Sequence, residues 1–152
     1  MRKPRSLKSK PATPEDHAEA LGRAASDADE RGDYQRAIEL FKKASQIGKS
    51  DSWHLNLGTL YDDKLVPPSP KRAVYYWKLA AKTHPAAAYN LAVHYFWQGN
   101  ERWRLFWLNR AIELGDKDAV QDFEEWKATR FAKGTSKSPS NLPKKKKKAV
   151  RR

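Results

Sequence analysis

The sequence predicts an all-α protein: a short α-solenoid of about three and a half helix-turn-helix repeats, or about seven helices, between disordered basic tails. Two observations lead to this fold class. One pattern of small and large residues recurs three times along the chain, at a period typical of stacked helical hairpins. The excess of positive charge is confined to the two ends, so the near-neutral middle is the part that can fold.

The recurring pattern has two parts, one for each helix of a hairpin. A Leu-Gly or Leu-Ala pair marks the first part, at Leu21, Leu57 and Leu91, which are 36 and 34 residues apart. The second part has small and large residues in one order: Ala37, Phe41 and Ala44, then Ala73, Trp77 and Ala80, then Leu108 and Ala111. Such hairpins stack because each can bury its apolar face only against its neighbours.

Capping residues and helix breakers place the first hairpin. The run Thr13-Pro14-Glu15-Asp16 predicts a helix start, because Thr caps, Pro suits the first turn and the acids face the positive end of the helix dipole. This helix should extend to about residue 30. Gly32 then turns the chain into a second helix over about 34–47, which Gly48 ends.

The second hairpin is bounded by acidic and proline residues. Asp51 or Ser52 caps a third helix that reaches about residue 64. A proline-rich turn follows at 66–69, and Pro70 opens a fourth helix that continues to about residue 82.

The third hairpin and a final helix complete the set. Pro85 opens a fifth helix, and Gly99-Asn100 separates it from a sixth over about 101–114. Gly115 stops the sixth, and Asp116 caps a seventh that runs to about residue 132. The step from Tyr61 to Trp77 is 16 residues, whereas the equivalent step from Tyr95 to Leu108 is 13, so the third hairpin should have the tighter turn.

These residues resemble the Sel-one-like repeat family, a relative of the tetratricopeptide repeat, over about residues 15–130. The first unit, with Gly32-Asp33-Tyr34, looks more like a tetratricopeptide repeat. The middle unit is most similar to the Sel-one-like pattern, through Leu57, Gly58, Tyr61, Ala73, Tyr76, Trp77, Ala80 and Ala81. Two departures stand out: Asp62-Asp63-Lys64 and Pro67-Pro68 replace a Gly-rich turn, and Asp122 replaces a repeat Leu. A polar residue there suits a terminal cap whose outer face meets water.

Charge divides the chain into three segments. Residues 1–13 hold five basic residues and residues 133–152 hold nine, with no acid in either. All 18 acidic residues lie between Glu15 and Glu125. Like-charge blocks rich in Pro and Ser cannot bury enough apolar surface to offset chain entropy. We therefore predict disordered tails at 1–13 and 133–152 around one repeat domain at 14–132.

Aromatic residues recur at helical spacing, which is typical of packing between helices. We expect Tyr61, Trp77, Tyr95 and Trp107 in the core. The run Arg102 to Trp107 alternates basic and aromatic residues, a pattern that also occurs where bases stack or a membrane interface is touched. Packing with solvated arginines is the favoured interpretation of this run.

Composition and motifs exclude several classes of protein. The chain has no cysteine, so it has no disulfide framework and no cysteine-ligated metal. The four histidines, His17, His54, His84 and His94, lack metal-ligand spacing, and there is no Gly-rich phosphate loop or nucleophile motif. No secretory signal is recognisable, and the most apolar stretch, 85–97, is too short to span a bilayer. We predict a soluble cytoplasmic non-enzyme with no cofactor and no small-molecule substrate.

The family resemblance implies that the first helices of successive units line a concave groove that holds a peptide or partner helix. Asn56 and Asn90 occupy matching positions, each one residue before the repeat Leu. Asparagine can hold an extended peptide by bonding its N–H and C=O groups. With Thr59, His94 and Trp97, these asparagines are the candidate groove residues. The alternative is that the asparagines cap or stitch neighbouring helices.

Two classes of function remain open. The first is a repeat adaptor that binds another protein or peptide in the groove. The second is a nucleic-acid- or ribosome-associated protein whose tails bind phosphate. The candidate polyanion-binding residues are Lys144, Lys145, Lys146, Lys147, Lys148, Arg151 and Arg152. This run also resembles a nuclear localisation signal, which would matter only in a eukaryote, and the tails could instead serve solubility alone.

Overall fold

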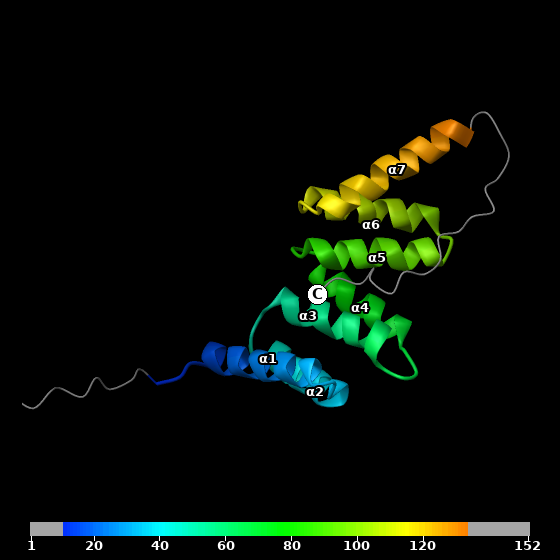
Figure 1. The fold of residues 1–152 in the computed structure, drawn as a ribbon. Coiled ribbons are helices and arrows are strands. Elements are labelled where there is room, and N and C mark those ends of the chain that lie inside the picture. The colour runs from blue at the N-terminus through cyan, green and yellow to red at the C-terminus, as the bar shows by residue number, and fades with distance from the viewer. Residues whose placement is uncertain (1–10, 134–152) are drawn as a thin grey trace, which may run out of the picture. The chain divides into compact units, whose positions relative to one another are not determined.

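The computed structural model describes residues 11–133, and these form seven α-helices and one π-helical turn (Figure 1). In chain order they are α1 (Pro14–Glu30), α2 (Tyr34–Ile47), α3 (Asp51–Thr59), the π-helix η1 (Leu60–Lys64), α4 (Pro70–Ala80), α5 (Pro85–Trp97), α6 (Glu101–Glu113) and α7 (Lys117–Lys133). No strand occurs over this described stretch. The all-α helical-repeat fold is therefore confirmed.

The described residues divide into two compact units between Lys49 and Ser50. The first contains α1 and α2, and the second contains α3 to α7. The predicted tails lie almost wholly outside the described residues, as do all the candidate polyanion-binding residues at 144–152. Tail disorder and a single domain at 14–132 accordingly remain predictions.

In the first unit, a hydrogen-bonded cap starts α1, and small residues then let α1 and α2 pack closely. Thr13 and Asp16 form the predicted capping box: the Thr13 hydroxyl accepts from the Asp16 N–H at 3.1 Å, and the Asp16 carboxylate accepts from the Thr13 N–H at 2.8 Å. These hydrogen bonds hold the pKa of Asp16 below its usual value. The buried side of α1 is Ala18, Gly22, Ala25 and Ala28, and it packs on α2, where Ala37, Ile38, Leu40, Phe41 and Ala44 are buried.

Three connections use one joint, in which a glycine precedes Asp or Asn. Gly32, Gly99 and Gly115 have φ of 80°, 69° and 91°, which only glycine adopts readily. The next residue donates its N–H back to the last turn of the preceding helix, and its side chain caps the following helix. The three residues with this double role are Asp33, Asn100 and Asp116.

In the second unit, Gly58 of α3 makes room for Trp77 of α4. A Cβ added to Gly58 would lie 2.9 Å from the Trp77 Cγ and still closer to other indole atoms. Trp77 is 1% exposed, and Leu55, Leu57, Leu60 and Tyr61 are buried on the same hairpin. The Leu-Gly signature of the sequence thus has a direct packing cause: only a residue without a side chain leaves space for this indole.

The next hairpin places smaller partners at the equivalent positions. Ala92 of α5 replaces Gly58, and Leu108 of α6 replaces Trp77. Both are buried, together with Leu91 and Ala111. The turn between these helices comprises residues 98–100, compared with 65–69 after η1, which agrees with the tighter third turn predicted from the sequence.

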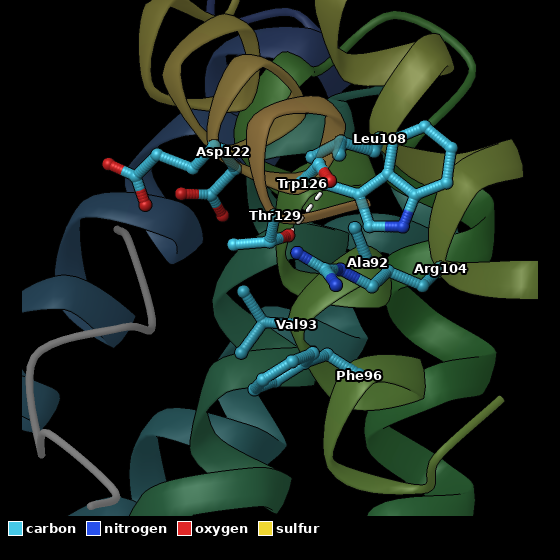
Figure 2. A pocket seen from close by; sticks show the side chains of 9 residues that line it. Ala92, Val93, Phe96, Arg104, Leu108, Asp122, Trp126 and Thr129 are labelled. Atoms are coloured by element: carbon cyan, nitrogen blue, oxygen red, sulfur yellow. Dashed lines mark hydrogen bonds between the residues drawn. The ribbon is translucent and has the colours of Figure 1, made fainter. Parts of the chain in front are cut away.

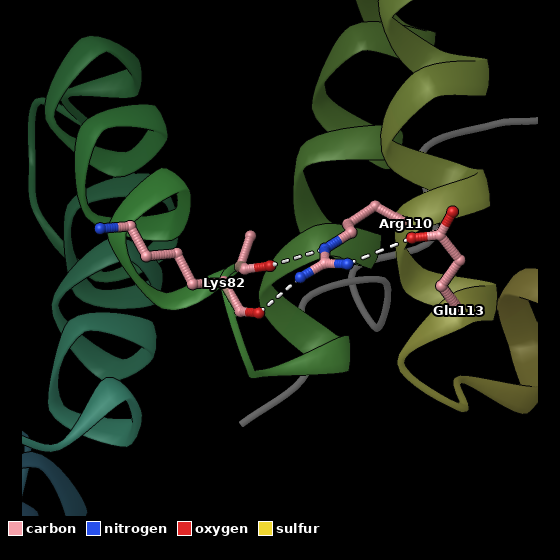
Figure 3. A network of polar contacts seen from close by, with 4 residues as sticks. Lys82, Arg110 and Glu113 are labelled. Carbon is pink, nitrogen blue, oxygen red and sulfur yellow. Dashed lines mark hydrogen bonds and ion pairs between the residues drawn. The ribbon is translucent and has the colours of Figure 1, made fainter.

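Arg110 of α6 ties this hairpin to the preceding one (Figure 3). Its guanidinium donates to the backbone oxygen of Lys82 at 2.6 Å and to that of Ala81 at 3.4 Å, just past the end of α4. It also pairs with Glu113 at 3.1 Å. A cation at these carbonyls satisfies acceptors left open by the helix end and stabilises the negative end of the helix dipole.

Local differences from the predicted elements have identifiable causes. The third helix does reach residue 64, but its last turn is π-helical, closed by the Leu65 N–H to the Leu60 carbonyl at 3.2 Å. The fourth helix ends at Ala80, two residues early: the Thr83 N–H bonds to the Ala80 carbonyl only three residues back, and His84, which precedes Pro85, is extended. Tyr95 and Trp107 were predicted to lie in the core, but their side chains are only half-buried.

Candidate functional site

The five candidate groove residues all lie in the second unit, but they differ in burial. Asn56 and His94 are half-buried, and Trp97 is 41% exposed. Thr59 is buried and donates its hydroxyl to the Leu55 carbonyl of its own helix at 3.1 Å. Asn90 is 2% exposed. The matching positions of Asn56 and Asn90 therefore do not give matching environments, and the exposed chemistry of this set comes from Asn56, His94 and Trp97.

His94 and Trp97 occupy the C-terminal half of α5, one helical turn apart. Burial lowers the pKa of His94, with nearby Asp62 of η1 raising it and Lys78 of α4 lowering it. The imidazole packs edge-on against Tyr95 with ring centres 5.3 Å apart, and Trp97 packs in the same way against Phe96 at 5.2 Å. The neutral form of His94 is thus favoured beside an exposed tryptophan.

A pocket of about 310 Å³ opens between α5, α6 and α7 (Figure 2). Helix α5 supplies Ala92, Val93 and Phe96, α6 supplies Arg104 and Leu108, and α7 supplies Asp122, Glu125, Trp126 and Thr129. Its lining thus combines apolar side chains with two carboxylates and one guanidinium. This pocket was not predicted. The sequence held two signals near it, the Leu108 that stands in the register of Trp77 and the polar Asp122 in place of a repeat Leu.

Asp122 of α7 is the half-buried acid of this pocket. It accepts a hydrogen bond from the Tyr89 hydroxyl of α5 at 2.8 Å. Burial raises its pKa, against the opposing effects of Tyr89 and Arg104, and Glu125 and Asp116 raise it further. The expectation that Asp122 faces water as a terminal cap is therefore corrected, because this side chain joins α7 to α5.

A second polar contact fixes α7 to the start of α6. The Trp126 indole N–H donates to the Glu101 carboxylate at 2.6 Å, and Arg130 pairs with the same oxygen at 3.1 Å. The hydrogen bond from Trp126 is the largest cause that holds the pKa of Glu101 low, with Arg130 and Arg104 contributing. One wall of the pocket is thereby held by a directed bond to an indole.

The run Arg102 to Trp107 presents aromatic rings at the surface as well as in packing. Trp103 and Phe106 are 42% and 54% exposed and contact each other at 5.4 Å between ring centres. Trp103 also stacks on Tyr95 at 6.0 Å. The arginine in the middle of the run, Arg104, places its guanidinium 4.5 Å from the Phe96 ring centre. Packing and partial exposure thus occur together here.

Neither a metal cluster nor a membrane span is found among residues 11–133. No group of three or more His, Asp or Glu in this range could hold a metal ion. No helix there is both long and apolar enough to cross a bilayer.

Comparison with protein families matches the Sel1 repeat to residues 14–49, 54–82, 85–100 and 105–116. These segments cover more than half of the chain. The chain belongs to the Sel1 repeat family. Sel1 repeats generally mediate protein–protein interaction, and the repeat itself is not catalytic. No curated protein matches the chain at a significant level.

The Sel1 match follows the hairpins. The first two segments contain α1–α2 and most of α3–α4, whereas the third hairpin is matched in two pieces that leave out residues 101–104. This gap falls next to the tight turn before α6. The match ends at Asp116, so α7, which builds one wall of the pocket, lies beyond the matched Sel1 pattern.

Proposed function

We propose that this Sel1 repeat protein is a non-enzymatic adaptor that binds a peptide or partner protein along the exposed side of α5 and α3 in its second unit. The observation that carries the proposal is Trp97, a large aromatic side chain that is 41% exposed on the first helix of a repeat. Tryptophan is among the residues that contribute most to protein interfaces. Family membership supports a protein as the partner.

The helical spacing of α5 relates Trp97 to two other candidate residues. Asn90, His94 and Trp97 are four and three residues apart, so they follow one side of the helix. Their exposure rises along it, from 2% at Asn90 to 41% at Trp97. Asn90 would therefore support this side from within, while Trp97 and His94 meet the partner and Asn56 contributes from α3.

Selection of peptides from a random library against the full chain tests this proposal. We expect Trp97→Ala to lower the affinity of the chain for the selected peptides by about tenfold or more, or about 1.4 kcal/mol. The melting temperature of the chain should not change. The matched control is Tyr75→Ala, because Tyr75 is 59% exposed but lies on α4. Equal losses from the two variants, or failure to select any peptide, would refute a binding site at Trp97.

The alternative, phosphate binding by the tails, rests on nine basic residues with no acid at 133–152. If about six of them engage duplex DNA, affinity should fall by roughly three orders of magnitude between about 50 and 200 mM salt. Removal of residues 133–152 should abolish most of this binding. Salt-insensitive binding, or full binding without this tail, would exclude the tail as the segment that binds nucleic acid.

A cytoplasmic location of the protein also remains a proposal.

A further inference from the structure

The pocket between α5, α6 and α7 has a shape and charge that the proposed contact at Trp97 does not use. We propose that this pocket receives the side chain of a lysine or arginine from the bound partner. The inference rests on the proposed function and deepens it, because it names the chemistry of the partner that the second unit selects.

The size of the pocket suits one long side chain. A volume of about 310 Å³ is at the lower end of the range of roughly 300–1,000 Å³ for small-molecule sites. Val93, Leu108 and Phe96 provide apolar contact surface. Lysine and arginine bury their methylene stems along such surface while the charged end meets polar groups.

The charge of the lining favours a cation. Asp122 and Glu125 supply two carboxylates against the single guanidinium of Arg104. Asp122 forms no ion pair within 4 Å with any residue in the described range, and its hydrogen bond comes from the neutral hydroxyl of Tyr89. A half-buried carboxylate without a direct cationic partner carries a desolvation cost that an incoming cation would offset.

The aromatic walls do not compete for this role. The guanidinium of Arg104 already lies over Phe96 at 4.5 Å, and that of Arg130 lies over Trp126 at 5.4 Å. These intramolecular cations occupy ring surface. The carboxylates of Asp122 and Glu125 each accept one hydrogen bond from a neutral group, Tyr89 and Gln121, and each keeps a second oxygen as an acceptor for a ligand. An anion would meet Arg104 but would be repelled by both carboxylates.

The pocket also adjoins the proposed contact site at Trp97. Val93 and Phe96, which line it, are the helix neighbours of His94 and Trp97 on α5. Phe96 contacts Trp97 directly, with ring centres 5.2 Å apart. A partner seated on Trp97 therefore lies next to two residues of the pocket lining.

Titration of the full chain with four-carbon fragments, followed by NMR, tests the inference. The probes are n-butylammonium, n-butylguanidinium, n-butanol and butyrate, and the signals are the Trp126 indole N–H and the amides of Val93 and Leu108. We expect the cations to bind about tenfold more tightly than butanol, a difference of about 1.4 kcal/mol. The double variant Asp122→Asn, Glu125→Gln should lose this preference, and the side-chain amide introduced by Asp122→Asn keeps an acceptor for Tyr89. The control Glu124→Gln, an exposed α7 residue paired with Lys127 outside the pocket lining, should retain it.

Several results would overturn the assignment. Tighter binding of butyrate would make Arg104 the centre of an anion site, and equal binding of cation and alcohol would remove the role of charge. A cation preference that survives in the double variant would show that the cations bind elsewhere than at Asp122 and Glu125. Stronger cation binding after Lys144 to Lys148 are changed to Gln would assign the pocket to the chain's own tail. Because the fragments report on the pocket without a peptide, failure here with intact Trp97-dependent peptide binding defeats the inference alone. Fragment binding without any selected peptide would instead defeat the proposed function.

Discussion

The α3–α4 and α5–α6 hairpins place different residue pairs at equivalent positions. Gly58 accommodates Trp77 in the first, whereas Ala92 and Leu108 hold these places in the second. A glycine beside an indole fills the space between the two helices of the hairpin. An alanine beside a leucine has a smaller combined volume, and Ala92 and Leu108 both line the 310 Å³ pocket. One repeat pattern can thus build a closed core in one hairpin, whereas in the next the equivalent pair lines a candidate binding site that α7 completes.

The largest expected effect is the loss of the indole from the closed hairpin. Trp77→Ala should lower the free energy of unfolding by roughly 3 to 5 kcal/mol, because it removes a fully buried aromatic side chain. Urea unfolding of the full chain measures this change. A loss below about 1 kcal/mol would be typical of a surface position and would break the comparison between the two hairpins.

A double-mutant cycle can convert the closed pair into the open one. Gly58→Ala should destabilise the chain by about 1–3 kcal/mol, since the new methyl group overlaps the indole. Adding Trp77→Leu, which reproduces the Ala92–Leu108 pair, should cost less than the sum of the two single changes. Additive losses in urea unfolding would show that Gly58 and Trp77 do not depend on each other.

The tie between the two hairpins should have an intermediate effect. Arg110→Ala should destabilise the chain by about 1–2 kcal/mol, because the carbonyls of Ala81 and Lys82 lose their donor. Arg36→Ala is the matched control: Arg36 also forms an exposed pair three residues along its helix, with Glu39, and such pairs contribute about 0–1 kcal/mol. Equal changes in melting temperature for the two variants would show that Arg110 contributes only through its ion pair with Glu113 and that its bonds to the carbonyls add no stability.

The smallest expected effect concerns pH in the open hairpin. Burial raises the pKa of Asp122 in the folded chain, so ionisation disfavours folding there. Asp122→Asn should therefore stabilise the chain slightly near neutral pH. This gain should shrink as the pH falls through the raised pKa and vanish below the ordinary value of 3.8, where Asp122 is protonated in both states. Melting temperatures measured at several pH values test this account, and a stability gain that grows on acidification would contradict it. Besides burial, the groups that act on the pKa of Asp122 are Tyr89, Arg104, Glu125 and Asp116.

The sequence predicted the helices well because their signals are local and redundant. Thr13, Gly32, Asp116 and the repeated Leu and Ala positions each act within one or two turns. Burial was harder to predict, since successive residues on a helix point about 100° apart. Trp107 is only half-buried because its neighbour Leu108 takes the core position.

The pocket depends on information that a periodic pattern does not contain. It arises from how far side chains on three helices fill a shared space, and α7 lies outside the recurring pattern. Asp122 was noticed as a departure from leucine, but its partner Tyr89 is 33 residues away. Asn56 and Asn90 likewise share a register yet differ in burial, so their roles stay a prediction.

The glycine joints also determine where the chain tolerates a change of length. Asp33, Asn100 and Asp116 each finish one helix and start the next, so an insertion beside them would disrupt two helix ends together. In the 65–69 segment the backbone bonds to η1 are made at the two ends, where the N–H groups of Leu65 and Ser69 donate to the carbonyls of Leu60 and Tyr61. Ser69 makes no side-chain cap, and Val66, Pro67 and Pro68 are exposed. An epitope or fluorophore for following this protein therefore belongs beside Val66, Pro67 or Pro68, away from the N–H groups of Leu65 and Ser69 that bond to η1.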